Sequence, residues 1–176
     1  MCIHYYNYLS NMNLNNSLKL YKLASEIINK CRSKKFKISV AESCTGGLIS
    51  SIITSIPGSS DVFECGFITY SNNSKIKFLN VSQNTLSLYG AVSEEVVIEM
   101  ISGLKLRTQS DILMAISGIA GPGGGTKDKP EGLVWISYAL KNNNIKTSKQ
   151  KYGPIGRQLV REKSSIESLK YLLSLL

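Results

Sequence analysis

Two glycine-bearing loops carry the residues of this chain that are best suited to chemistry. The first is AESCTGG, residues 41–47, and the second is SGIAGPGGGT, residues 117–126. Each loop directly follows a β-branched apolar run, ISVAE or ILMAIS, which predicts a buried parallel strand. Open α/β sheets place their ligand crevice at the carboxyl ends of such strands. We therefore expect the two loops to meet at one site, of the kind that serves a small-molecule enzyme.

A hydroxyl group, a phenol and an amine could form a hydrolytic centre beside the first loop. Ser43 stands where the strand gives way to an apolar helix, and Tyr70 and Lys75 follow at the end of another strand, in TYSNNSK. A lysine that is partly removed from water can lose its proton near neutral pH and act as a base, and a tyrosine can relay the proton. We predict that these three residues are catalytic. Backbone amides around Thr45 and Gly46 would hold the oxyanion of an acyl-transfer intermediate.

The residue types disfavour other catalytic arrangements that use a nucleophile. The single histidine is His4, so a Ser-His-Asp or Cys-His arrangement would have to draw its base from the N-terminal stretch. Without that base, we interpret Cys44 as a small buried side chain. Structural alternatives stay open for the trio: Ser43 as a helix cap, Tyr70 as a strand-end aromatic residue and Lys75 as a surface charge.

The second loop resembles neither of the common phosphate-binding motifs. No Gly-Lys-Ser/Thr follows its glycines, as a Walker motif requires, and no helix follows them, as a dinucleotide fingerprint requires. Several glycines together with Ser117 and Thr126 favour close backbone approach to a ligand over a merely flexible connection. We predict that Ser117, Gly123 and Gly124 bind the substrate.

Length and composition bound the class of protein. The chain has 176 residues, of which 43% are hydrophobic, and we expect a loose tail over residues 1–15 and a single domain over residues 16–176. No apolar run approaches the ~18 residues that a membrane span needs, and the N-terminal stretch does not resemble a secretory signal. The four cysteines lack CxxC spacing, so we expect reduced thiols, no metal site and a cytoplasmic protein.

The basic charge does not by itself identify a partner. Lysine and arginine number 21 against 12 acidic residues, which gives a formal net charge of +9. The lysines are scattered and form no stripe interleaved with aromatic residues, so we expect neither a nucleic-acid partner nor a membrane partner. We interpret them as solvated side chains, with a weak steering field for a phosphorylated substrate as the alternative.

Periodicity and turn residues predict helices interleaved with strands. This order predicts an α/β fold, a three-layer α/β/α sandwich, whose sheet is mixed but mostly parallel because the last two strands are close enough to form a hairpin. The expected helices cover residues 17–31, 46–56, 74–79, 83–89, 93–106 and the chain from 157 onward, and the expected strands cover 37–41, 62–70, 111–116, 133–140 and 147–152.

Four ordered motifs resemble the CinA carboxy-terminal domain family, the nicotinamide-nucleotide amidases also called PncC. They are AESCTGG, FxxGFITYSNxxK, GAVSEE and GIAGPGGGTxxKPxG, and the resemblance extends over residues 17–172. It implies an α/β/α fold and hydrolysis of the carboxamide of nicotinamide mononucleotide to nicotinate mononucleotide and ammonia, without a metal or other cofactor. The implied partner is thus a small nucleotide substrate, and we also expect a homo-oligomer, a dimer or higher.

The resemblance also implies roles for individual residues. The serine, tyrosine and lysine that are implicated in catalysis in the family fall on Ser43, Tyr70 and Lys75. A threonine before the second loop and an arginine near the last helix are also implicated at the active site, and they match Ser117 and Arg157. We expect the guanidinium of Arg157 to clamp the 5′-phosphate of the substrate.

The chain departs from the family pattern at three places. Ser117 replaces the usual threonine, Glu131 stands where an apolar residue is usual, and no aspartate directly precedes Arg157. Two competing functions also stay open. One is a catalytically idle nucleotide-binding or competence-related regulatory module, and the other is a Ser-Lys peptidase of broader specificity.

Overall fold

A computed structural model describes residues 13–176 of the chain and shows helices alternating with strands. A short 3-10 turn, η1, precedes the second strand. The elements in chain order are α2 (Leu14–Lys34), β1 (Ile38–Glu42), α3 (Leu48–Thr54), η1 (Ser59–Asp61), β2 (Phe63–Ile68), α4 (Asn72–Leu79), α5 (Gln83–Tyr89), α6 (Glu94–Arg107), β3 (Ile112–Gly118), β4 (Leu133–Leu140), β5 (Lys146–Lys151) and α7 (Arg157–Leu173).

The five strands form one mixed sheet in the order β2-β1-β3-β4-β5. Strand β1 pairs in parallel with both β2 and β3, whereas β4 runs antiparallel to β3 and β5. All strands except β4 therefore point in the same direction, which confirms the mostly parallel sheet predicted from the sequence. The carboxyl ends of β1, β2 and β3 lie at the same end of the sheet, and both glycine-bearing loops begin there.

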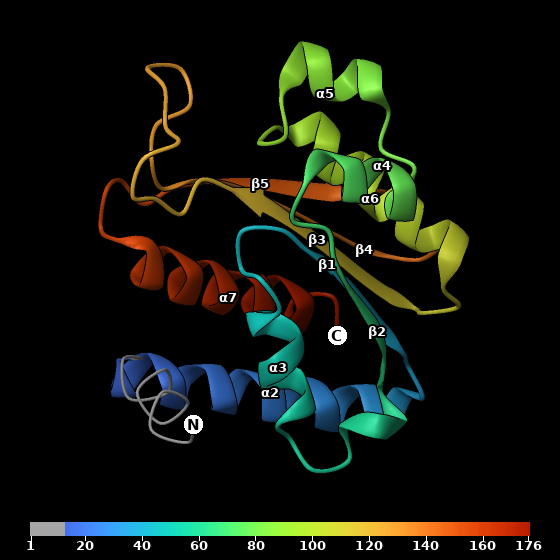
Figure 1. Cartoon of the computed structure of the whole chain (residues 1–176). Helices are drawn as coiled ribbons and strands as arrows, with labels where there is room; N and C mark the ends of the chain where they lie inside the picture. Colours follow the sequence, from blue (N-terminus) through green and yellow to red (C-terminus); the bar gives the residue numbers. More distant parts are fainter. Residues whose placement is uncertain (1–12) are drawn as a thin grey trace, which may run out of the picture.

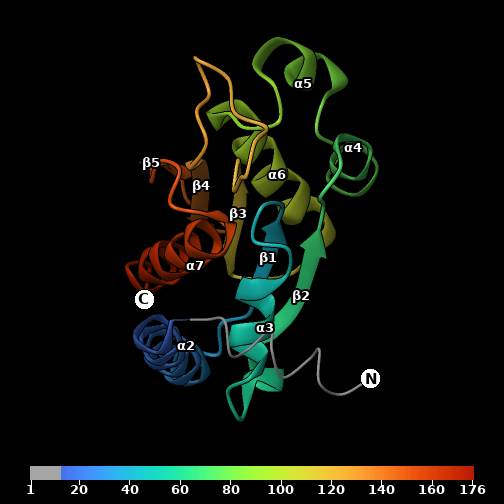
Figure 2. The same ribbon diagram turned by 60° about the vertical axis from the view of Figure 1, so that its left-hand side comes forward.

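Helices cover both faces of the sheet and complete the three layers (Figures 1 and 2). On one face, strand residues such as Val40 and Met114 pack against α2, α3 and α7. On the other face, Ala41 and Leu113 pack against α6 and the neighbouring α4–α5 segment. Successive residues of β1 and β3 thus face opposite cores, which is why both strands are buried almost without a break.

The first helix begins earlier than the apolar pattern indicates. The predicted tail covered residues 1–15, most of which lie outside the described residues, but α2 already starts at Leu14. Its first turn is stabilised by Asn13, whose side chain accepts a hydrogen bond from the Asn15 amide at 3.0 Å. The apolar stripe starts later because Leu14 and Leu18 are exposed, so the pattern did not predict the capped end.

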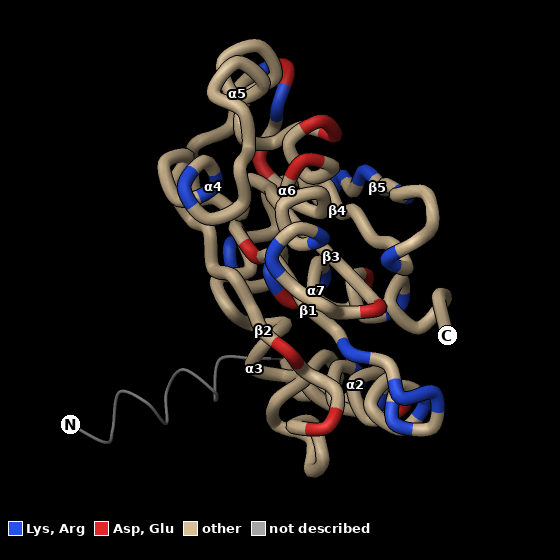
Figure 3. The backbone as a smooth tube through the Cα atoms, turned by 90° about the vertical axis from the view of Figure 1, so that its right-hand side faces the viewer, with Lys and Arg blue, Asp and Glu red and all other residues tan. Residues whose placement is uncertain are grey.

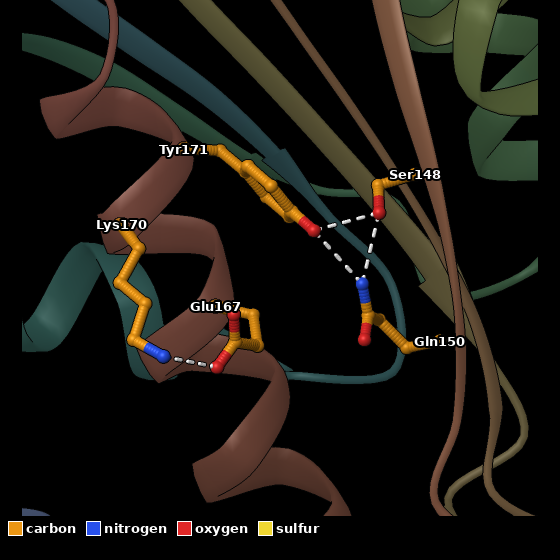
Figure 4. Close-up of polar contacts among 5 residues, drawn as sticks. All are labelled: Ser148, Gln150, Glu167, Lys170 and Tyr171. Carbon is orange, nitrogen blue, oxygen red and sulfur yellow. Dashed lines mark hydrogen bonds and ion pairs between the residues drawn. The ribbon is translucent and has the colours of Figure 1, made fainter.

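Helix α7 is anchored to the sheet near its C-terminal end by the side chain of Tyr171. Its ring stacks on that of Tyr138 in β4, with the ring centroids 4.7 Å apart. Its hydroxyl lies 2.7 Å from the Ser148 hydroxyl and accepts a hydrogen bond from the Gln150 side chain at 2.9 Å, both on β5 (Figure 4). These contacts fix the axis of α7. The N-terminal end of the helix lies near the loops at the carboxyl ends of the strands.

Charged positions are distributed over many elements. Figure 3 shows Lys and Arg on α2, α4, β5 and α7 rather than in one stripe. In the part of the chain that the structure describes, no helix is both long enough and apolar enough to cross a membrane.

The packing of α4 against α6 leads to a stability prediction. A Cβ atom added to Gly103 of α6 would lie 2.1 Å from the backbone oxygen of Leu79, the last residue of α4. We expect Gly103→Ala to lower the free energy of unfolding by about 1–3 kcal/mol, because the rigid backbone contact outweighs the better helix propensity of alanine. Urea unfolding would measure this. Ser102→Ala, at an exposed neighbouring position, is the control, and equal stability of the two variants would contradict the prediction.

Candidate active site

Ser43 occupies the corner at which β1 turns toward α3. Its amide donates to the carbonyl of Ile116 in β3 at 3.1 Å, so the corner is tied to the neighbouring strand. The carbonyl of Glu42 also accepts the Thr69 amide at 2.8 Å, which brings the end of β2 alongside. Ser43 is only 7% exposed, so its hydroxyl lies in a largely dry environment.

A buried carboxylate caps the helix that follows this corner. Glu42 is fully buried and accepts hydrogen bonds from the amides of Gly47, Ile49 and Ser50 at 2.8–3.2 Å, and from the Ser50 hydroxyl at 2.7 Å. A carboxylate can be buried here because the N-terminal amides and dipole of α3 stabilise its charge. The first turn of α3 is thus already satisfied from within the chain and is not an open anion site.

The side chain of Lys75, which belongs to α4, points at the Ser43 hydroxyl. Its Nζ atom donates to Ser43 Oγ at 3.0 Å and to the carbonyl of Thr69 at 2.7 Å. The side chain is 1% exposed, and both of these partners are uncharged. Burial lowers the pKa of the Lys75 ammonium from 10.5 to about 8, because desolvation penalises the charged form, with a weaker opposing effect from Cys44. An amine with this position and this pKa is chemically able to accept the serine proton once it is neutral.

Tyr70 lies at the rim of the site rather than between the serine and the lysine. Its side chain is 57% exposed, and its hydroxyl accepts a hydrogen bond from Arg157 Nη2 at 2.7 Å. Arg157 Nη1 in turn donates to the carbonyl of Gly121 at 3.3 Å. The predicted proton relay through Tyr70 stays a prediction, since the phenol is held by the guanidinium in this arrangement.

One cavity brings together the predicted catalytic residues and two of the predicted substrate-binding residues, Ser117 and Arg157. It has a volume of about 190 Å³ and opens at the carboxyl ends of the strands. Ser117 closes one side and is itself fixed, because its hydroxyl donates to the carbonyl of Ala91 at 2.7 Å. The cavity is lined by Ser43, Cys44, Tyr70, Lys75, Ala91, Val92, Ser117, Gly118, Ala120 and Arg157.

The backbone amides of the first loop can be accounted for one by one. Gly46 donates to the carbonyl of Ser43 at 3.0 Å, and Leu48 donates to the carbonyl of Thr45 at 3.3 Å, while Glu42 holds the remaining amides of the turn. Within residues 13–176, the amides of Cys44 and Thr45 donate to no other residue. These two amides are therefore the candidates for an oxyanion hole, and the Gly46 amide, which we also predicted for that role, is already used in the turn.

Thr45 and Cys44 have different surroundings. The hydroxyl of Thr45 is buried and has no hydrogen-bond partner in the described part of the chain. Thr45 is fully buried and does not line the cavity, so its predicted contact with the substrate stays a prediction. Burial raises the pKa of the Cys44 thiol to about 12, so it stays protonated and is a poor nucleophile. The contrast between a tuned lysine on Ser43 and a neutral thiol on Cys44 favours the hydroxyl as the attacking group.

The second glycine loop is organised around a carboxylate that the sequence did not single out as a functional group. Glu131 accepts a hydrogen bond from the Gly123 amide at 3.0 Å. A Cβ at Gly121, whose φ is +73°, would lie 2.1 Å from Glu131 Oε1, so this placement of the carboxylate requires glycine. Gly123 and Gly124 are exposed and do not line the cavity, and their predicted contact with the substrate stays a prediction.

Arg161 is a second residue that sequence reasoning missed. Its Nε and Nη2 atoms both donate to the carbonyl of Thr45, at 3.0 and 2.7 Å. The signal that could have indicated it is its spacing of four residues from Arg157, which puts both guanidinium groups on one face of α7.

In the described residues, no group of three or more His, Cys, Asp or Glu side chains is arranged to hold a metal ion.

Comparison with known families and proteins gives a consistent result. The family model of the CinA C-terminal domain matches residues 20–176. The chain is 44% identical over 155 residues to the nicotinamide-nucleotide amidohydrolase PncC of Enterobacter agglomerans, and the match covers 88% of this chain and 94% of the relative. A CinA-like protein of Thermosipho melanesiensis is 43% identical over 160 residues, but the match spans only 40% of that longer protein.

Solved structures share the fold. The competence/damage inducible protein CihA from Agrobacterium tumefaciens superposes with a TM-score of 0.88 at 39% identity, covering 89% of this chain and 95% of that one. A competence-damaged protein (CinA) superfamily protein from Escherichia coli superposes with a TM-score of 0.85 at 30% identity, covering 94% and 100% of the two chains. The three-layer arrangement is therefore that of known structures.

The lowered pKa of Lys75 predicts a pH-dependent stability. Below pH 8 the amine is protonated in both the folded and the unfolded chain, so the full cost of burying an ammonium is present. Between pH 8 and 10.5 the unfolded chain binds more protons, and the stability of the wild type should rise relative to Lys75→Met by up to about 3 kcal/mol. Urea unfolding of both proteins from about pH 7 to about pH 10 would measure this change.

Lys77→Met is the matched control, because Lys77 lies on the same helix and is more exposed than Lys75. Its difference in stability from the wild type should stay constant over the same pH range. A constant difference for Lys75→Met as well would show that the folded and unfolded pKa values of Lys75 are equal, contrary to the prediction.

Proposed function

Because the chain belongs to the CinA C-terminal domain family, we propose that it is an amidohydrolase that converts nicotinamide mononucleotide to nicotinate mononucleotide and ammonia. The observation that carries the proposal is the 3.0 Å contact between the buried Lys75 amine and the Ser43 hydroxyl. The relative from Enterobacter agglomerans, which carries the name of this activity, supports the choice of substrate. The proposed setting is the cytoplasm, where nucleotides and reduced thiols occur.

The proposed reaction passes through an acyl-enzyme. Neutral Lys75 takes the proton of Ser43 as the serine oxygen attacks the carboxamide carbon, and the oxyanion that forms is bound by the amides of Cys44 and Thr45. The C–N bond then breaks, and the Lys75 ammonium gives its proton to the departing nitrogen, which leaves as ammonia. A water molecule, deprotonated in the same way by Lys75, attacks the ester and releases the carboxylate product from Ser43.

The size of the cavity supports a division of the substrate into two parts. A volume of about 190 Å³ is smaller than the ~300–1,000 Å³ of sites that enclose a whole drug-sized ligand. The carboxamide-bearing ring would enter the cavity, and the ribose phosphate would extend past its rim. Arg157 lies at that rim, where its guanidinium can exchange Tyr70 for an anionic oxygen.

A catalytically idle binding module is the second candidate. The competence-related names of the similar proteins of known structure favour it, because they refer to no reaction. Such a module would bind a nucleotide in the same cavity without releasing ammonia. The buried lysine argues for the enzyme, since desolvating an amine beside a hydroxyl is costly and serves no purpose in binding alone.

The assay that tests the proposal also identifies the nucleophile. Purified protein is incubated with nicotinamide mononucleotide, and ammonia and nicotinate mononucleotide are measured. We expect Ser43→Ala to lower kcat by at least about 10³-fold, because it removes the attacking oxygen, whereas Cys44→Ala retains a substantial part of the activity. Absence of ammonia from the wild type would support the idle module. A covalent acyl group on Cys44 would contradict the assignment of Ser43.

The position of Arg157 predicts a dependence on the substrate phosphate. We expect Arg157→Ala to cost about 2–4 kcal/mol in kcat/KM on nicotinamide mononucleotide, the scale of a lost charge-assisted contact. On nicotinamide riboside, which lacks the phosphate, the loss should be much smaller. Steady-state kinetics on both substrates measure the two losses, with Arg32→Ala on the distant helix α2 as the control. Equal losses on both substrates would place Arg157 at the carboxamide end or in the fold.

A further inference from the structure

We propose that Arg161 is a positioning residue that holds the oxyanion-binding turn behind Ser43 in its working geometry. The inference rests on the amidase function proposed above, but it concerns a residue outside the cavity. Arg157 lines the cavity and Arg161, one helical turn further along α7, does not. Arg161 therefore acts on the site through the backbone that it contacts.

The contact is a fork of two donors on a single acceptor. Arg161 Nε and Nη2 lie 3.0 and 2.7 Å from the carbonyl oxygen of Thr45, and the Leu48 amide adds a longer bond of 3.3 Å to the same oxygen. Hydrogen bonds from a charged donor are stronger than those between neutral groups. The guanidinium is thus the main restraint on the Thr45 carbonyl.

The Thr45 carbonyl bears on one of the two candidate amides, that of Thr45 itself. The peptide between Ser43 and Cys44 is restrained by the bond from the Gly46 amide to the Ser43 carbonyl. The Thr45 amide has no such restraint on its own peptide within residues 13–176, so its direction depends on how the rest of Thr45 is held. Arg161 supplies a restraint on Thr45, because it holds the carbonyl of the peptide between Thr45 and Gly46.

The backbone beyond Thr45 is intrinsically soft. Gly46 and Gly47 have φ values of +60° and +90°, conformations that glycine adopts at little cost but leaves as readily. Glu42 fixes the amides from Gly47 onward, and Arg161 fixes the carbonyl before them. Without Arg161, the middle of this segment would be held mainly by two backbone hydrogen bonds, from the Gly46 amide to the Ser43 carbonyl and from the Leu48 amide to the Thr45 carbonyl.

The test compares Arg161→Met and Arg161→Lys with Lys163→Met, which removes an exposed cation from the same helix. We expect Arg161→Met to lower kcat by about 30-fold with little change in KM, because misdirected amides weaken binding of the transition state rather than of the substrate. Arg161→Lys should recover part of the loss, since an ammonium keeps the charge but presents no fork. Thermal unfolding of each variant establishes that it is folded at the assay temperature.

A second measurement is independent of the substrate. A fluorophosphonate reacts with an activated serine when the Ser43 oxygen attacks phosphorus, the P–F bond breaks, fluoride leaves and Lys75 takes the serine proton. The developing phosphoryl oxygen uses the same amides as the oxyanion, so labelling of Arg161→Met should be at least about 10-fold slower by intact-mass analysis, with Lys163→Met at the wild-type rate.

The two measurements separate this proposal from the proposed function. A wild type that is labelled at Ser43 but releases no ammonia from nicotinamide mononucleotide would contradict the substrate, while the labelling rates would still decide the role of Arg161. Labelling of Arg161→Met at the wild-type rate would overturn the positioning role. An Arg161→Met variant with raised KM and unchanged kcat, or a wild type that is not labelled at all, would also overturn it.

Discussion

The burial of one amine beside one hydroxyl is the constraint on which the rest of this structure depends. Lys75 sits on a short helix and Ser43 at a strand corner, so their 3.0 Å contact requires β1, β2 and α4 to meet at one point. The Thr69 carbonyl receives the same amine, and Gly103 allows α6 to approach the end of α4. Packing of this kind places an amine with a lowered pKa beside a serine without the need for a histidine.

The electrostatics of the first loop differ from what its position alone indicates. A helix amino terminus is ordinarily an anion site, and the sequence predicts that backbone amides around Thr45 and Gly46 bind an oxyanion there. In the structure, Glu42 fills that position and neutralises the first turn of α3. The consequence is a narrow site, in which two amides rather than a whole helix end remain for a developing negative charge.

Sequence reasoning succeeded where the signal is local. Strand β4, helix α5 and the start of α7 lie where periodicity and turn residues predict them, and Ser43 and Lys75 each follow a strand that the sequence predicts. The missed residues depend on long-range partners. Arg161 meets a carbonyl 116 positions away, and Glu131 turns inward only because the glycine loop folds around it. The four-residue spacing from Arg157 could have indicated the helix face of Arg161, but its contact with Thr45 and the inward turn of Glu131 come from tertiary packing.

Helix α7 shows how the fold gives up local helix stability for a positive field at the site. It begins after Gly156 with no side-chain cap and no acidic residue in its first turn, and it places Arg157 and Arg161 near the positive end of its own dipole. An isolated helix of this sequence would be disfavoured at that end. The stacking of Tyr171 on Tyr138 and the hydrogen bonds to β5 hold the opposite end, so tertiary contacts offset the unfavourable charges. The guanidinium groups of Arg161 and Arg157 can then contact the Thr45 carbonyl and the cavity rim, although cations at these positions do not stabilise the helix.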